Sequence, residues 1–297
     1  LHSALSYFRC SPCCVADGDI QPVGPSLNGG LFLGFKLPDG LEVNVDETAP
    51  GDVPLSQADG VVEKDMVQLD GGAVYAGQWL GDKRHGRGTI TRPDGGRYDG
   101  QFRHDRAHGA GTFRHASGDS YTGQWFEDKA HGFGKFRHAD GSLYEGEWEM
   151  DAKLGKGFES WVDGSQFEGQ YLNGKKHGAG QFHAADASNF SGQFADDVMH
   201  GEGVYTFADG RIYDGNWRNS QMHGNGSMTW PDGRSYKGEF VEDRKSGEGI
   251  FAWPDGRSYS GQWHMGRQHG KGTFVDNRGR PRKGQWSEGQ RVKWLDS

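Results

Sequence analysis

The sequence has 297 residues and a formal net charge of −8 at pH 7. Only 33% of the residues are hydrophobic, whereas 51 are glycine and 12% are aromatic. This composition provides too little apolar material for a thick two-layer core and too many rings for a disordered chain. The sequence has no general basic character, which excludes nucleic acid as the expected ligand, and it lacks the long apolar run of a transmembrane helix.

Residues 1–60 are predicted to form an acidic segment that is largely loop and linker. Residues 1–69 contain ten acidic and three basic residues. Within them, Pro38-Asp39-Gly40 separates two β-prone stretches, which favours a hairpin at 30–46. Residues 61–69 are expected to add a strand or cap at the edge of the structure that follows.

All three cysteines lie near the start of the sequence, at Cys10, Cys13 and Cys14. No disulfide framework is therefore expected in the rest of the chain, which suits a reducing, cytoplasmic compartment. Their spacing supplies half of a zinc site without a second pair, so no metal is predicted. An inert tail and lipid attachment at these three residues remain the open alternatives.

From about residue 70 the sequence repeats with a period of 23 residues, which indicates a repeat architecture. Each unit begins with aromatic-x-Gly-x-aromatic, as in Tyr75-Ala-Gly-Gln-Trp79, and continues with Gly-x-Gly-x-aromatic, as in Gly109 to Phe113. The first aromatic residue of the unit recurs nine times without a slip in register, at Tyr75, Tyr98, Tyr121, Tyr144, Phe167, Phe190, Tyr213, Tyr236 and Tyr259.

Each unit is predicted to form two antiparallel strands. Because side chains alternate along a strand, ring, glycine and ring fall on one face, and the glycines of the second strand leave a trough for a neighbouring ring. Turns such as Pro231-Asp232-Gly233 join the units. The predicted fold is all-β, an elongated single-layer antiparallel sheet of hairpin repeats, twisted into a trough or open spiral. Nine full repeats are expected at about 70–276, with a partial tenth and a cap at 277–297.

This pattern resembles the MORN (membrane occupation and recognition nexus) repeat over most of the sequence. The resemblance implies a non-catalytic scaffold that binds proteins or phospholipids at membranes or the cytoskeleton. It also leaves open the regulatory array of a lipid kinase or methyltransferase, whose catalytic domain this sequence lacks. The sequence departs locally from the pattern, and slightly looser packing is expected at these positions: Leu154, Glu159, Phe167, Phe190 and Ser246.

Three features resemble catalytic or ligand sites, and for each a structural interpretation is favoured. Gly169 to Lys176 spaces glycine and lysine like a phosphate-binding loop, but Lys176 stands where Ser or Thr would hold Mg²⁺. Recurrent aspartates such as Asp232 are expected to stabilise turns. A histidine recurs at one position, where it is expected to pack at the strand start and bond a neighbouring loop: His85, His108, His131, His177, His200, His223 and His269. We therefore predict no catalytic residues, no cofactor and no enzymatic activity.

The predicted partners are proteins. Residues 140–209 contain thirteen acidic and four basic residues, which favours a basic or helical segment. The candidate protein-binding groove comprises Tyr98, Tyr121, Trp125, Tyr144, Trp148, Tyr213, Trp217 and Tyr236.

Two alternatives concern lipid and self-association. A basic cluster near the C-terminal end could hold anionic phospholipid and place the chain peripherally on a membrane. Its members are Arg278, Arg280, Arg282, Lys283, Arg291 and Lys293. The basic end and the acidic middle together also allow a homo-oligomer.

Overall fold

The computed structural model of the protein describes residues 60–295, which form two compact units, 60–134 and 135–295. The predicted hairpin at 30–46 and the three cysteines lie outside the described residues. Residues 60–295 contain strands and one short 3₁₀ turn, η2 (Asp70–Gly72). None of the helical structure in this range has the length and apolar content needed to cross a membrane.

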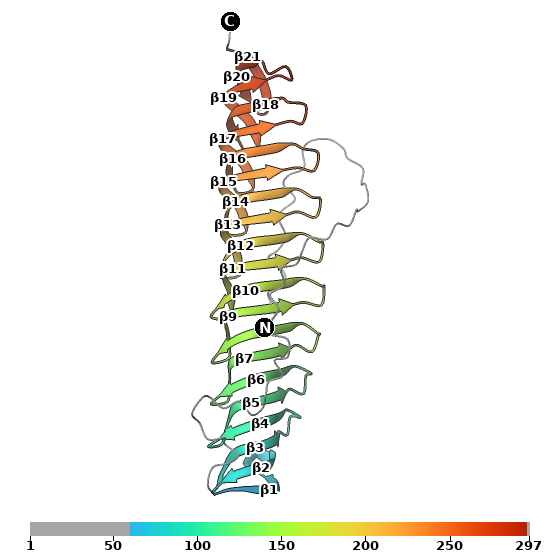
Figure 1. Cartoon of the computed structure of the whole chain (residues 1–297), viewed down its shortest axis with the longest axis vertical. Coiled ribbons are helices and arrows are strands. Elements are labelled where there is room, and N and C mark those ends of the chain that lie inside the picture. Colours follow the sequence, from blue (N-terminus) through green and yellow to red (C-terminus); the bar gives the residue numbers. More distant parts are fainter. Residues whose placement is uncertain (1–59, 296–297) are drawn as a thin grey trace. The chain divides into compact units, whose positions relative to one another are not determined.

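In the unit of residues 60–134, successive strands are joined as antiparallel hairpins (Figure 1). The strands are β1 (Val61–Gln68), β2 (Val74–Leu80), β3 (Lys83–Thr91), β4 (Arg97–Arg103), β5 (Arg106–Arg114), β6 (Ser120–Phe126) and β7 (Lys129–Arg137), of which β7 contains the boundary between the units. The predicted first strand, residues 61–69, is present as β1 and pairs with β2.

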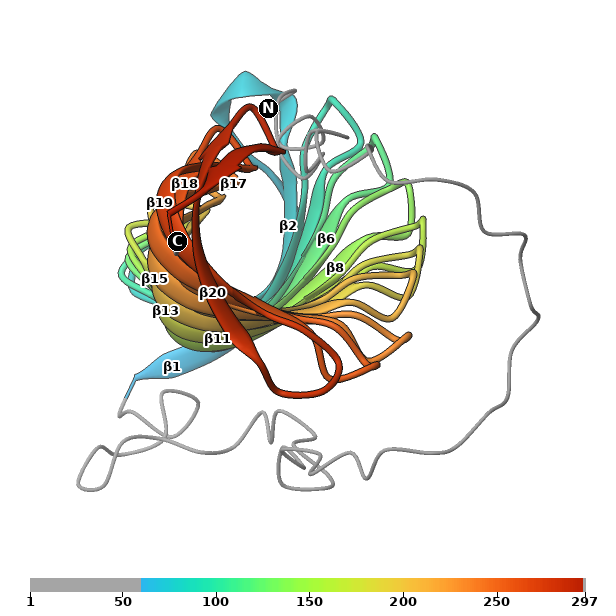
Figure 2. The same ribbon diagram turned by 90° about the horizontal axis from the view of Figure 1, so that it is seen from above.

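The unit of residues 135–295 continues the same pattern, with each strand paired to the next in the chain. Its strands are β8 (Leu143–Glu149), β9 (Ala152–Ser160), β10 (Gln166–Leu172), β11 (Lys175–His183), β12 (Asn189–Ala195), β13 (Val198–Thr206), β14 (Ile212–Arg218), β15 (Gln221–Thr229), β16 (Ser235–Val241), β17 (Arg244–Ala252), β18 (Ser258–His264), β19 (Arg267–Val275), β20 (Pro281–Ser287) and β21 (Gln290–Trp294). Figure 2 shows that the strands of each unit are bent rather than straight. The predicted all-β architecture of tandem antiparallel hairpins is confirmed.

One face of each sheet carries the repeated rings, and we call it the ring face. On β2, the ring centroids of Tyr75 and Trp79 are 5.2 Å apart with nearly perpendicular planes. On β14, Tyr213 lies between Trp217 and Phe240, at 5.1 and 5.0 Å, in the same edge-to-face geometry. This geometry is favourable because the positive edge of one ring meets the negative face of the next. The opposite face, which we call the polar face, is mainly polar but also carries apolar side chains such as Val204 and Ile250.

The glycines of each second strand make room for these rings, as predicted. A Cβ at Gly157 would lie 2.6 Å from atoms of the Tyr144 ring, which is closer than atoms can pack. The Tyr144 hydroxyl then donates to the backbone oxygen of Glu147 at 3.0 Å, so the buried polar tip is satisfied. Phe167 and Phe190, where looser packing is expected, are 0% and 1% exposed, so their rings are buried as fully as the tyrosines of the other repeats.

A bulge at the Gly of each His-Gly pair is a feature that sequence reasoning did not identify. The pairing shifts between Gly77 and Trp79, and Gly86 adopts a φ of 75°, which favours glycine. The shift leaves the backbone N–H of Arg87 without a strand partner, and Gln78 Oε1 accepts its hydrogen bond at 2.7 Å. The glutamine between the repeat glycine and the second ring is therefore structural.

The recurrent turn aspartates have the predicted role. Asp140 Oδ1 accepts a hydrogen bond from the backbone N–H of Ser142 at 2.8 Å, and Asp232 Oδ1 accepts one from Arg234 at 3.0 Å. Each aspartate thus closes its own turn, which is the local bonding that favours Asp at such positions.

Candidate functional site

Six of the eight residues predicted to line a groove are buried by their own neighbours. They are at most 4% exposed: Tyr98, Tyr121, Tyr144, Tyr213, Trp217 and Tyr236. Trp125 and Trp148 are half-buried, so these two present part of their rings to solvent. The eight rings do share the ring face, but binding along them stays a prediction.

A second row of rings on this face, missed by the sequence analysis, is more accessible. Each ring of this row belongs to the residue directly before a Pro-Asp-Gly turn or its equivalent in another repeat. We call these rings the turn-side row. Phe251 and Trp253 have centroids 4.6 Å apart, and Trp230 contacts Phe251 at 5.7 Å. The half-buried members of the row are Trp161, Phe207, Trp230 and Trp253. Their common place before a turn is the sequence signal that could have identified them.

In four repeats the second residue of the second strand is a cation that lies over rings of the ring face: Arg84, Lys153, Lys176 and Lys245. Lys245 Nζ lies 4.8 Å from the ring centroids of both Phe251 and Trp263, and 5.5 Å from those of Trp230 and Tyr236. A cation over a ring face is attracted by the negative charge of that face. The ring face therefore accepts alkylammonium groups within the chain itself.

Glu159 stands where other repeats place a ring and forms a buried polar cluster with two of these cations. Lys153 Nζ lies 2.6 Å from Glu159 Oε1, Lys176 Nζ lies 4.0 Å from Oε2, and the Tyr171 hydroxyl donates to Oε2 at 2.9 Å. Burial lowers the pKa of Lys176, whereas burial and then the Glu159 carboxylate raise the pKa of Tyr171 far above its ordinary value. Lys176 is also the last residue of the stretch Gly169 to Lys176, whose spacing resembles a phosphate-binding loop. In the structure this stretch belongs to β10 and β11 and contains no helix, unlike a phosphate-binding loop.

A pocket of about 540 Å³ opens on the ring face of residues 60–134. Its lining combines rings with two arginines and two aspartates: Arg84, Ile90, Arg92, Tyr98, Phe102, Asp105, Ala107, Phe113, Trp125 and Asp128. Burial and then the Asp128 carboxylate raise the pKa of Tyr98 well above its ordinary value, so this hydroxyl stays protonated.

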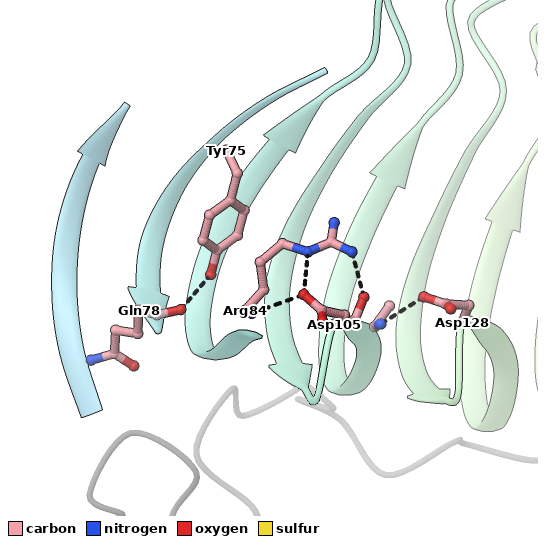
Figure 3. A network of polar contacts seen from close by, with 6 residues as sticks. Tyr75, Gln78, Arg84, Asp105 and Asp128 are labelled. Atoms are coloured by element: carbon pink, nitrogen blue, oxygen red, sulfur yellow. Dashed lines mark hydrogen bonds and ion pairs between the residues drawn. The ribbon is translucent and has the colours of Figure 1, made fainter. Parts of the chain in front are cut away.

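The two aspartates of the pocket come from turns and tie each repeat to the one before it (Figure 3). Asp105 Oδ1 accepts hydrogen bonds from the backbone N–H of Arg84 at 3.0 Å and from its Nε at 3.2 Å. Asp128 Oδ1 accepts one from the backbone N–H of Ala107 at 2.7 Å. Arg84 and Ala107 lie beyond the end of the ladder with the following strand, so these bonds satisfy backbone N–H groups that have no strand partner there. Both carboxylates are thereby held at fixed positions beside the rings.

The histidine position differs in part from expectation. His85 is buried, as predicted, but among residues 60–295 neither of its ring nitrogens has a hydrogen-bond partner. The expected bond to a neighbouring loop is therefore wrong for His85, which contacts the His104 ring at 5.1 Å instead. Burial, followed by the nearby His104 and Arg103, lowers the pKa of His85.

We expect His85 to make the protein less stable in mild acid. Because its folded-state pKa lies below the ordinary 6.5, the folded chain binds fewer protons than the unfolded chain as the pH falls through this value. Stability should therefore fall between about pH 7 and pH 5. His85→Leu, the residue found at the equivalent Leu154, should reduce this loss. Urea unfolding midpoints at the two pH values measure it, and an equal loss in both proteins would contradict the prediction.

The predicted basic cluster is divided between the two faces of the sheet. Arg282 and Arg291 both stack on the Trp294 ring, at 4.0 and 4.3 Å, and so lie on the ring face. Lys283 and Lys293 pair with the residues that alternate with the rings, which places them on the polar face. Asp276 binds Arg280 at 2.7 Å and accepts a hydrogen bond from the backbone N–H of Arg278.

The fold and the ring face define a tandem β-hairpin repeat scaffold. The MORN repeat family model matches nine consecutive stretches: 75–97, 98–120, 121–143, 144–166, 167–188, 190–210, 213–233, 236–256 and 259–279. The chain belongs to the MORN repeat family.

No curated protein matches the sequence. Among solved structures, the TCP10 domain of CPAP from Danio rerio is 10% identical, with 78% of this chain and 99% of that chain covered and a TM-score of 0.26. The TCP domain of SAS-4 from Drosophila melanogaster, in complex with a proline-rich motif of Ana2, is 12% identical, with 67% and 90% covered and a TM-score of 0.30. The CPAP G-box domain is 10% identical, with 75% and 97% covered and a TM-score of 0.34. Such low TM-scores support no conclusion about this chain.

Proposed function

We propose that the protein is a non-catalytic scaffold that binds extended or helical protein segments along its ring face. The observation that carries this proposal is the turn-side row, whose rings are half-buried and lie against a rigid buried layer. Large rings held in fixed orientations make strong protein contacts because little side-chain freedom is lost on binding. The neighbouring Lys245 adds a polar group beside these rings.

A phospholipid surface is the alternative partner, and its support is weaker. The basic residues that would hold anionic headgroups lie on both faces of β20 and β21, so they do not form one surface. Arg280 is also neutralised by Asp276. We place the scaffold in the cytoplasm, because all three cysteines precede the repeats and the repeats therefore need no disulfide.

Peptide selection tests the protein-binding proposal. Peptides of about 12 residues are selected from a displayed random library on the full chain, and their affinities are compared for Trp230→Ala/Trp253→Ala. Because truncating a central ring removes a binding hot spot, we expect affinity to fall roughly tenfold or more.

The matched control removes apolar groups of the polar face. Val204→Ala/Ile250→Ala truncates side chains that are 37% and 51% exposed, and it should leave the same affinities unchanged. If selected peptides bind the ring variant as tightly as the native protein, or if the polar-face control weakens them equally, the ring face is not the binding surface.

A further inference from the structure

Because the repeats share one register, the site around Lys245, which a lysine ammonium occupies, can be compared with the equivalent site around Ala107, which has no cation at that position. Around Lys245 in the eighth repeat, the four rings that contact its ammonium are Trp230, Tyr236, Phe251 and Trp263. Six repeats earlier, the same register positions hold Arg92, Tyr98, Phe113 and Trp125, and the residue in the place of Lys245 is Ala107.

Two rings of the earlier site, Tyr98 and Trp125, keep the geometry of the later one. The centroids of Tyr98 and Trp125 are 5.2 Å apart, as are those of Tyr236 and Trp263. The Trp125 indole N–H donates to the backbone oxygen of Gly111 at 3.0 Å, and the Trp263 indole makes the equivalent bond at 3.1 Å. The Tyr98 and Trp125 rings beside Ala107 therefore have the orientation that receives an ammonium group around Lys245.

The alanine leaves this site open. The side chain of Ala107 ends at its Cβ, so the space that the lysine stem occupies around Lys245 is free, and the 540 Å³ pocket lies there. The pocket is larger than one lysine side chain, so it can admit the four-carbon stem and ammonium together with neighbouring atoms of a partner segment. An arginine side chain is also cationic. We favour lysine because lysine occupies the equivalent site at Lys245, where four rings surround the ammonium.

The carboxylates of the pocket favour a cationic occupant. Arg84 and Asp105 form an ion pair, so together they add no net charge. Asp128 has no ion-pair partner among the described residues, and its position is Gly266 in the repeat after Lys245, where no carboxylate is present. Opposing this charge, Arg92 lies over Phe113 at 5.3 Å, on the exposed side of the pocket where Trp230 stands in the filled site.

We propose that this pocket binds a lysine side chain of a partner segment, with its ammonium on the faces of Tyr98, Phe113 and Trp125 and beside Asp128. This inference rests on the proposed function as a protein-binding scaffold and names the chemistry of one contact. The partner supplies in trans the cation that Lys245 supplies within the chain.

The experiment uses the full chain and the peptide acetyl-Gly-Gly-Lys-Gly-Gly-amide at low salt, with binding followed by NMR at the Trp125 indole. The same peptide with norleucine in place of lysine keeps the stem and removes the charge. We expect the norleucine peptide to bind roughly tenfold more weakly, because the attraction between cation and rings is lost. Asp128→Asn, which keeps the acceptor for Ala107, should weaken only the lysine peptide.

Two further variants introduce residues that other repeats have at the same register positions. One should block the pocket and the other should raise its affinity for the lysine peptide. Ala107→Lys fills it as Lys245 fills the equivalent site, so the lysine peptide should no longer bind, while Gln268→Lys, at the same register elsewhere, should change nothing. Arg92→Trp supplies the fourth ring found at Trp230 and removes a repelling charge, so affinity should rise severalfold.

Equal binding of the norleucine and lysine peptides, or binding that survives Ala107→Lys, would overturn the inference, as would no binding by either the native protein or Arg92→Trp. These failures are distinct from failure of the proposed function. That proposal is judged by the turn-side row, through Trp230 and Trp253, which are not in this pocket.

Discussion

Gly226→Ala should lower the free energy of unfolding by about 3 kcal/mol, because it drives a methyl group into a ring that cannot move away. A Cβ at Gly226 would lie 2.6 Å from Tyr213 Cε2 and 2.7 Å from Cζ. Tyr213 is 0% exposed and is held at both sides by Trp217 and Phe240. The clash with the new methyl group could therefore be relieved only if several rings of the ring face moved together.

The backbone conformation of Gly226 does not contribute to the expected loss of stability. The Gly226→Ala variant therefore tests the contact between the added methyl group and the ring alone. Gly226 is not among the residues with positive φ, whereas Gly224 of the same strand has a φ of 67°. Gly224→Ala should cost about 1 to 2 kcal/mol, mainly through this backbone strain, since the nearest atom to a Cβ there would be Asn216 Oδ1 at 3.3 Å. Ser227→Ala, on the polar face beside Gly226, should change stability by less than about 0.5 kcal/mol.

Urea unfolding followed by circular dichroism measures these differences. Amide hydrogen exchange should also show the lost protection concentrated in β14 to β17, because a repeat contacts mainly its neighbours. A Gly226→Ala protein as stable as Ser227→Ala would show that the glycine trough is not required for ring packing.

The sequence predicted the strands, the shared face of the rings and the turn aspartates because these follow from local rules. Strand alternation alone places Tyr213 and Trp217 on one face, and turn chemistry alone explains Asp232. The 23-residue period then repeats each local inference many times, so a single ambiguous copy carries little weight against the others.

The sequence did not predict the contacts that depend on the distance between repeats. Gln78 caps an N–H that is exposed only because of the bulge, and Asp105 reaches a strand 21 residues earlier in the chain. The sequence also did not predict how exposed each ring is, since Trp217 and Trp125 occupy the same position of the motif yet only Trp217 is buried. How much of a ring its neighbours cover depends on the size of side chains at other register positions, such as Ala107.

Glu159→Ala should also lower the free energy of unfolding by about 3 kcal/mol, because it removes the carboxylate that contacts both Lys153 and the buried Lys176. The side chains of Glu159, Lys153 and Lys176 are 13%, 21% and 9% exposed, so water replaces little of what is lost. The Tyr171 hydroxyl also loses its acceptor. A loss below about 1 kcal/mol, measured by urea unfolding, would show that the cluster behaves like an exposed ion pair.

Replacing the whole cluster by the residues of other repeats should reverse this loss. Phe136 and Phe182 occupy the position of Glu159 in the adjacent repeats, and Ala130 and Met199 occupy that of the two lysines. Glu159→Phe/Lys153→Ala/Lys176→Met therefore keeps the register and packs an apolar set in place of the ions. Because a buried ion network is often no more stable than such a set, the triple variant should be as stable as the native protein or up to about 4 kcal/mol more stable. If the triple variant is as unstable as Glu159→Ala, the lysines contribute through packing on the rings of Tyr144 and Trp161 rather than through charge.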